Sequence, residues 1–243
     1  MPLKTTVDER ISGLLAKMRA NGTLGHDDPD PQAALAPTDV IESDHPAVTA
    51  AAERIAGDAE GAEAAQRLFA YVRDEVKYEM CPNAERREDW RASAVLEQGH
   101  GFCQQKAVLL ASLLRARGIP SAIVLQDLLD HKIPPHYVAL METQRLEVHG
   151  LTAAHIDGRW VRLDATLPRK LVEKKGYRLV EFDGTNDAVL QETDAAGLPH
   201  FTLVQEFGTW ADMPDEVVEH TVALEFLHLP EFKQVAQKHG PGM

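Results

Sequence analysis

Residues 99–120 read GHGFCQQKAVLLASLLRARGIP and join a glycine-rich turn to a strongly helical pattern. One helical face carries the recurring apolar residues, namely Ala107, Leu110, Ala111 and Leu114. The two arginines and the glycine at 115–118 are typical of a helix end. The pattern predicts a helix that begins close to Cys103, so this cysteine is expected in the first helical turn.

Cys103 is therefore a candidate nucleophile. A thiol at a helix N-terminus meets the partial positive charge of unpaired backbone N–H groups, which favours the reactive thiolate. Gly99 and Gly101 let the chain approach a ligand closely just before the thiol, and the Cys103 amide is one expected donor to a substrate oxyanion. The alternative is that Cys103 is a small filler of the helix core, which is the commoner role of an isolated cysteine.

The dipeptide Asp157-Gly158 separates two segments of strand character, 145–155 and 159–164, and is a strong signal for a two-residue hairpin. That loop pairs Ile156 with Arg159 and places Leu151 opposite Asp164. His149 shares the strand face of Leu151 and is diagonal to Asp164, within reach of its side chain. The register thus predicts a contact between His149 and Asp164.

A histidine beside a carboxylate supplies the base that a thiolate nucleophile needs. His155 shares the strand face but lies at the turn, so it is the weaker candidate. No comparable register fixes a carboxylate beside the loop and edge histidines, which are His100, His131 and His136. Two alternatives stay open: His149 as an exposed strand residue with Asp164 as a strand-end cap, or a metal site made of His149, His155 and Asp164. The metal site lacks a recognisable zinc spacing with either cysteine.

The rest of the chain predicts an α+β protein, with helices from the first half packed on an antiparallel sheet. Helices are expected at about 7–20, in two pieces between 44 and 76, at 93–97, and after Pro214 and Pro230. Further strands are expected at 119–125, 137–141, 177–182 and 202–207, with a loop at 127–135. We expect a helix and extended connector at 1–42, a catalytic core at 43–168, and a C-terminal extension at 169–243 that flanks the cleft of the same globular unit.

Composition narrows the class of protein. The chain has 243 residues and a net charge of −13, from 25 Lys+Arg against 38 Asp+Glu, which repels nucleic acids and anionic membranes. Two cysteines, Cys81 and Cys103, argue against a disulfide framework and fit a reducing compartment. Charged residues near the N-terminus break any secretory signal, and no apolar run reaches the roughly 20 residues of a membrane span. We expect a cytoplasmic protein, with Cys81 a structural or incidental thiol. For Lys106 we expect a solvated or salt-bridged side chain, with assistance to the ionisation of Cys103, one turn earlier, as the alternative.

Several separated segments of the chain resemble the bacterial transglutaminase-like family. They are Ser43 to Pro46, Val72 to Val76, Gly101 to Cys103, Lys106-Ala107, Leu114 to Pro120, His149-Gly150 and Gly158 to Thr166. The resemblance spans about residues 43–168 and implies a papain-like arrangement, with Cys103 as nucleophile, His149 as general base and acid, and Asp164 as its orienting partner. The sequence departs from the family at Ala165, where proline is frequent, and at Gly150-Leu151, where many members have a small residue and an aromatic one.

The resemblance implies a cysteine acyl-transfer enzyme that forms a thioester and cleaves or makes amide bonds, without a cofactor or metal. Its partners would be a peptide, amide or thioester acyl donor and, for a transamidase, an amine acceptor. Two alternatives are off-loading or cyclisation of a carrier-bound thioester in natural-product biosynthesis, and a non-catalytic binding module that keeps the fold. The sequence does not specify the oligomeric state.

Overall fold

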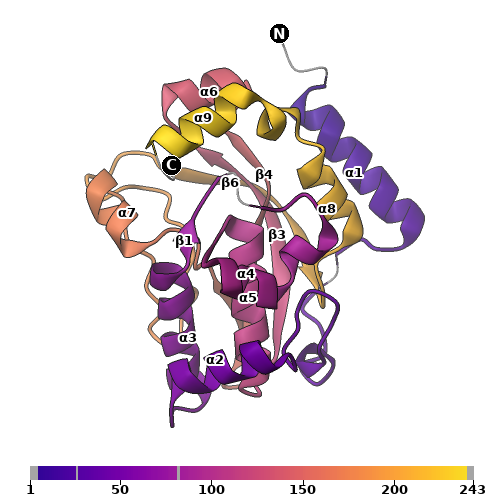
Figure 1. Ribbon diagram of the computed structural model, residues 1–243, viewed down its shortest axis with the longest axis vertical. Coiled ribbons are helices and arrows are strands. Elements are labelled where there is room, and N and C mark those ends of the chain that lie inside the picture. Colours follow the sequence, from indigo (N-terminus) through magenta and orange to yellow (C-terminus); the bar gives the residue numbers. More distant parts are fainter. Residues whose placement is uncertain (1–4, 26, 81–82, 240–243) are drawn as a thin grey trace.

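The computed structural model describes residues 5–25, 27–80 and 83–239, and its centre is a four-stranded antiparallel sheet (Figure 1). The strand order is β5-β4-β3-β6. The strands are β3 (Ser121–Asp130), β4 (Arg145–Ile156), β5 (Arg159–Leu163) and β6 (Phe201–Trp210). Two further short strands, β1 (Lys77–Tyr78) and β2 (His100–Gly101), pair in parallel outside this sheet. The α+β class with an antiparallel sheet is confirmed.

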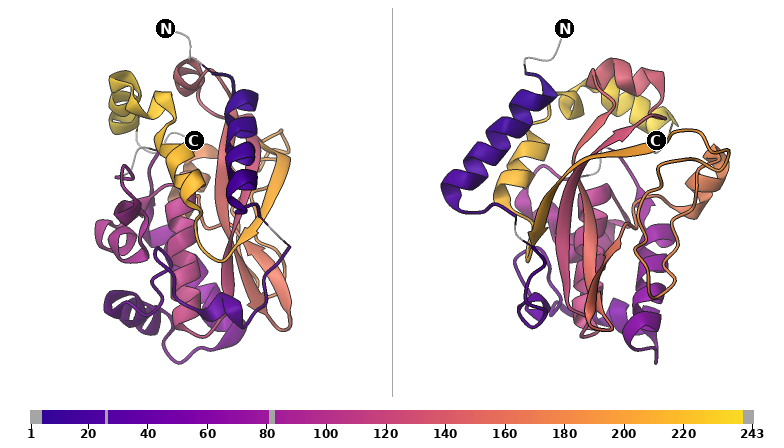
Figure 2. Two further views of the ribbon diagram at one scale, coloured as in Figure 1. Left: turned by 90° about the vertical axis from the view of Figure 1, so that its right-hand side faces the viewer. Right: turned by 180° about the vertical axis from the view of Figure 1, so that it is seen from behind.

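Helix α5 (Cys103–Ala116) lies between the sheet and an outer layer of helices. The outer helices are α2 (Pro46–Ala56), α3 (Gly61–Glu75) and α4 (Ala92–Gln98). Figure 2 shows this layer on one face of the sheet. All of α5 from Gln104 to Arg115 is buried, because it packs against β3 and β4 on one side and against the outer helices on the other. This central position makes α5 the framework for Cys103 at its first residue.

The predicted hairpin is present with the expected register. Ile156 pairs with Arg159, and the ladder ends at the pair Thr152 and Leu163. Asp157 and Gly158 both have positive φ values, 50° and 80°, as a two-residue turn of this kind requires. Asp164 follows directly after the last pair, so the hairpin delivers it to the same end of the sheet as His149.

The helices on either side of the core also follow the sequence pattern. Helix α1 (Val7–Asn21) starts with a capping box between Thr6 and Glu9, and α2 starts at Pro46 with His45 as its cap. Near the C-terminus lie α8 (Asp215–Val222), the 3-10 helix η3 (Glu225–His228) and α9 (Pro230–His239). Two further 3-10 helices are η1 (Ala33–Leu35) and η2 (Arg87–Trp90). Helices α1 and α8 pack against each other, far apart as they are in the sequence (Figures 1 and 2).

Three predicted elements are wrong. Residues 137–141 belong to a helix, α6 (Pro135–Met141), because Pro134-Pro135 sets the backbone for a helix start and Tyr137 and Met141 are buried one turn apart. Strand β3 continues through 127–130, where a loop is predicted. Residues 177–182 form no strand, and an unpredicted helix, α7 (Arg169–Lys175), precedes them.

Candidate active site

Cys103 is the first residue of α5, as predicted, and is partly buried. The residue before it, Phe102, has extended backbone and packs edge-on against Trp90 with ring centroids 5.0 Å apart. This aromatic contact fixes the chain at the point where it enters the helix. The thiol therefore lies at the positive end of the helix dipole on a rigid support.

His149 and Asp164 form the expected contact. Nε2 of His149 lies 2.7 Å from Oδ2 of Asp164, and both side chains are buried. The second carboxylate oxygen, Oδ1, accepts the backbone N–H of Thr166 at 3.1 Å. Asp164 is thus held on both oxygens, and it fixes the orientation of the imidazole.

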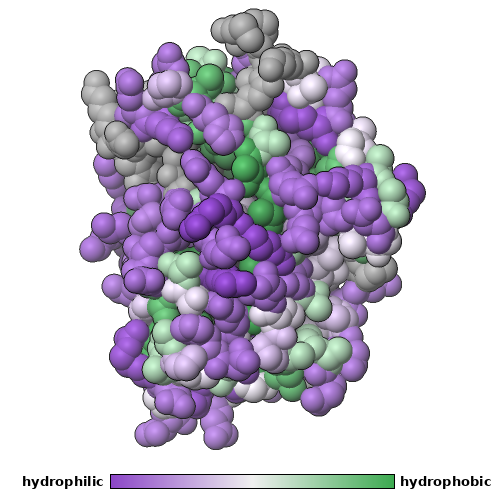
Figure 3. Space-filling model, turned by 45° about the vertical axis from the view of Figure 1, so that its right-hand side comes forward, coloured by the Kyte–Doolittle hydropathy of each residue, from purple (hydrophilic) through white to green (hydrophobic). Residues whose placement is uncertain are grey.

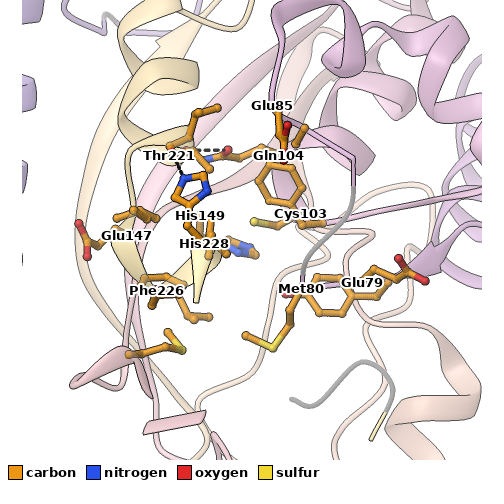
Figure 4. Close-up of a pocket in the computed structure, with 18 of the residues that line it drawn as sticks. Glu79, Met80, Glu85, Cys103, Gln104, Glu147, His149, Thr221, Phe226 and His228 are labelled. Atoms are coloured by element: carbon orange, nitrogen blue, oxygen red, sulfur yellow. Dashed lines mark hydrogen bonds between the residues drawn. The ribbon is translucent and has the colours of Figure 1, made fainter. Parts of the chain in front are cut away.

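The other ring nitrogen of His149 faces the cysteine side of the site. Nδ1 is buried and has no hydrogen-bond partner among the described residues, while Cys103 lies close enough to interact with the ring (Figure 4). Burial disfavours the imidazolium, but the charges of Asp164 and Cys103 outweigh it and raise the pKa of His149 to about 10. Burial likewise opposes ionisation of Asp164, and the imidazole outweighs it, so the Asp164 pKa lies below its usual value. The arrangement favours a protonated imidazole beside the Asp164 carboxylate.

The three residues meet at the side of a pocket of about 420 Å³, which Cys103 and His149 line (Figure 4). One wall consists of residues 78–80 and 83–85, a second comes from β4, and a third comes from α8, η3 and Lys233 of α9. The C-terminal segment therefore contributes directly to the site. The face seen in Figure 3 is mostly hydrophilic, with hydrophobic side chains gathered in a narrow hollow in its upper half.

Gln104 connects the cysteine helix to the histidine strand. Its Nε2 donates to the carbonyl oxygen of Val148 at 2.6 Å, and its Oε1 accepts from the Thr221 hydroxyl at 3.2 Å. Gly150 makes this close approach feasible, because a Cβ there would lie only 2.9 Å from the Cα of Gln104. Local sequence patterns do not single out Gln104; its signal is a polar pair, Gln104 and Gln105, at the start of a largely apolar helix.

Val148 has a left-handed backbone, with φ at 49°, which is rare for a β-branched residue. Its N–H donates to Oδ1 of Asp127 at 2.8 Å, and Asp127 also pairs with Arg145. Side chains thus hold both backbone polar groups of the residue that precedes His149. The loop predicted at 127–135 hid this role of Asp127, because it placed the residue outside the sheet.

Lys106 is buried, which corrects the expectation of a solvated or salt-bridged side chain. Its Nζ donates to the carbonyl oxygens of Arg73 at 3.2 Å, Val76 at 2.8 Å and Thr166 at 2.9 Å. Burial lowers the pKa of Lys106 to about 7, against the opposing charges of Asp164 and Asp74. One side chain of α5 therefore ties the end of α3 to the segment that follows Asp164.

The other sequence candidates lie elsewhere. His155 stacks edge-on with Trp160 near the hairpin turn and does not line the pocket. His100 lies beside Glu79, and His131 contacts Thr202. The residues that the structure describes hold no cluster of three or more side chains suited to a metal ion. Cys81 lies outside the described residues.

No helix within the described parts of the chain has the length and apolar character needed to cross a bilayer. Residues 49–165 match the family model of the transglutaminase-like superfamily core. A search of curated proteins finds no match.

Two solved bacterial structures are similar to the chain. A candidate cysteine protease from Cytophaga hutchinsonii is 19% identical, with a TM-score of 0.45, over 75% of this chain and 54% of the other. A candidate protease from Parabacteroides distasonis is 18% identical, with a TM-score of 0.34, over 58% of this chain and 27% of the other. The match thus spans about half of the first of these proteins and about a quarter of the second. Residues 49–165, which contain Cys103, His149 and Asp164, are thus similar to the core of the transglutaminase-like superfamily.

Proposed function

We propose that this protein is a cysteine acyl-transfer enzyme in which Cys103, His149 and Asp164 act as nucleophile, general base and acid, and orienting carboxylate. The observation that carries the proposal is the buried contact of 2.7 Å between His149 and Asp164 next to a cysteine at a helix N-terminus. A thiolate, an imidazole and a carboxylate in this order are the parts that nucleophilic acyl transfer needs.

In the first half of the reaction, the Cys103 sulfur attacks the acyl carbon of an amide and forms a tetrahedral oxyanion. The Cys103 backbone N–H, at the open end of α5, supports that oxyanion. The intermediate collapses to a thioester as the C–N bond breaks, and His149 gives its proton to the departing amine. In the second half, His149 takes a proton from water or an amine, which attacks the thioester and releases Cys103.

Asp164 acts through His149. Its Oδ2 holds Nε2 of the imidazole, which leaves Nδ1 to exchange the proton on the cysteine side. Its negative charge stabilises the imidazolium that exists while the sulfur is a thiolate. Asp164 is therefore a positioning residue, and the proton transfers belong to His149.

Mass spectrometry of the intact protein tests the proposal. After brief exposure to activated acyl esters, a mass increment is expected on Cys103, absent in Cys103→Ala and formed more slowly in His149→Ala. The same reaction with and without an added amine distinguishes ligation from hydrolysis through the mass of the released product. No adduct on Cys103 across chemically diverse donors would contradict the proposal.

A further inference from the structure

The pocket beside Cys103 is lined by apolar side chains and by polar or charged side chains. Their arrangement determines which substrate groups the pocket can bind. Its volume of about 420 Å³ lies in the range that holds a small organic group. Apolar side chains from three segments face it: Met80 before η2, Leu146 on β4, and Val222, Leu224, Phe226 and Leu227 at the C-terminal end of α8 and in η3. Covering an apolar surface of this kind with an apolar ligand group removes both from water, which favours binding.

The two charged side chains on the β4 wall already have partners of opposite charge. Arg145 pairs with Asp127 and with Asp8 of α1. Glu147 pairs with Arg10 of α1 and with His220 of α8, and its side chain is only 2% exposed.

The remaining charges lie at the rim. Lys233 of α9 is 4.0 Å from Glu85, and Glu79 is 3.2 Å from His100; all of these side chains are partly or largely exposed. Among the described residues that line the pocket, each arginine, lysine and glutamate therefore has an oppositely charged neighbour, except Glu79, whose neighbour is His100. A charged substrate group would lose its hydration inside the pocket without gaining an unpaired partner.

Two polar side chains of the lining are also engaged. Gln104 uses its amide nitrogen on Val148 and its oxygen on Thr221, and the side-chain amide of Asn83 donates to Asp89 at 3.3 Å. They hold the walls in place and are already committed to other partners. Specificity in the pocket therefore rests on shape and apolar contact.

We infer that this pocket receives the acyl side of the donor, and that its preferred acyl group is uncharged and apolar, of the size of a medium-length aliphatic chain. The inference rests on the proposed function, because the acyl carbon of the donor must lie at Cys103. The rest of the acyl chain then extends along the wall formed by Leu224, Phe226 and Leu227. The C-terminal segment 221–233 is then the part of the protein that selects the donor.

Three p-nitrophenyl esters that differ in acyl length and charge test this inference. They are the acetyl ester, the octanoyl ester, and the suberyl monoester, which has the octanoyl length and a terminal carboxylate. The rate of Cys103 acylation is followed by p-nitrophenolate release and by the mass of the adduct, with Cys103→Ala as the background. The octanoyl ester should react about tenfold faster or more than either of the others, relative to this background. Equal rates, or a preference for the acetyl or suberyl ester, would overturn the inference.

A matched pair of variants adds a test of the wall. Leu227 lines the pocket, whereas Leu229, two residues on, is similarly half-buried but does not line it. Leu227→Lys should raise the suberyl-to-octanoyl rate ratio several-fold, because it gives the carboxylate a partner, and Leu229→Lys should leave the ratio unchanged. The same change in both variants, or in neither, would contradict the assignment of this wall.

Binding of octanamide to Cys103→Ala, measured by titration calorimetry, separates the two proposals. If octanamide binds and no ester acylates the wild-type protein, the acyl-transfer function fails and the apolar site stands. If esters acylate Cys103 without chain preference, the function stands and the substrate class fails. If octanamide does not bind and no adduct forms, both fail.

Discussion

Gln104, the residue after Cys103, donates a hydrogen bond of 2.6 Å to the carbonyl oxygen of Val148, the residue before His149. This single side chain joins the element that carries the thiol to the element that carries the imidazole. The bond is buried, and the Val148 backbone that receives it is left-handed. The distance between the Cys103 thiol and the His149 imidazole therefore depends on the bond between their neighbours, Gln104 and Val148.

Replacement of Gln104 by leucine should lower the rate of Cys103 acylation by about 10- to 100-fold, because the sulfur and the imidazole lose their common anchor. The cost in stability should be about 1 to 3 kcal/mol, since the Val148 carbonyl is left buried and unpaired. Acyl-adduct kinetics and chemical denaturation measure the two effects. Gln66→Leu is the matched control, because Gln66 also donates from its amide to a backbone carbonyl, that of Phe182, but on α3. Equal acylation by the two variants would argue against this role of Gln104.

Replacement of the two hairpin histidines should have opposite outcomes. His149→Gln should slow acylation by more than about 100-fold, because it removes the base. His155→Gln should react like the wild-type protein, because His155 stacks on Trp160 away from the pocket. Single-turnover kinetics with one activated ester measure both variants. A large loss of acylation rate in His155→Gln, with little loss in His149→Gln, would show that His155 rather than His149 is the base.

The raised pKa of His149, about 10, makes stability depend on pH in a defined direction. The folded protein keeps the imidazole proton above the unfolded pKa of about 6.5, so the contribution is complete below that pH and is lost as the pH rises through about 10. The free energy of unfolding of the wild type minus that of His149→Gln should fall by up to about 1.4 kcal/mol per pH unit between these limits. Denaturant titrations at pH 6, 8 and 10 measure this difference, and a difference that is constant or rises with pH would contradict the prediction.

Lys106→Met should destabilise the protein by roughly 2 to 4 kcal/mol, because methionine fills the space but leaves three carbonyl oxygens without their donor. One of these carbonyls belongs to Thr166, whose N–H holds Asp164, so acylation should slow as well. Thermal unfolding and adduct kinetics measure the two effects. Lys170→Met, a lysine change on the surface helix α7, serves as the control. A variant as stable and as reactive as that control would show that Lys106 positions nothing.

The features of the fold that the sequence predicts correctly are those that depend on neighbouring residues. The start of α5 at Cys103 follows from helical spacing, and the hairpin follows from Asp157-Gly158, whose two residues accept positive φ. The strand predicted at 137–141 is wrong, because five residues carry little periodicity and a pair such as Pro134-Pro135 occurs in loops as well as at helix starts. The division into 1–42, 43–168 and 169–243 stays a prediction, and we propose it as a working description in which the last part completes the pocket.

The sequence by itself determined which side chains could carry the chemistry, and it paired two of them. A hairpin has a fixed register, so the numbering alone brought His149 to Asp164, and helical periodicity alone put Cys103 at a helix start. Tertiary structure decided the rest: that α5 lies against β4 closely enough to require Gly150, that Lys106 and Gln104 are buried partners of backbone carbonyls, and that residues 221–233 wall the pocket. The physical reason is range. Turn and helix preferences act over a few neighbours, whereas the burial of a lysine or the wall of a pocket depends on segments thirty or more residues apart, which local sequence patterns do not encode.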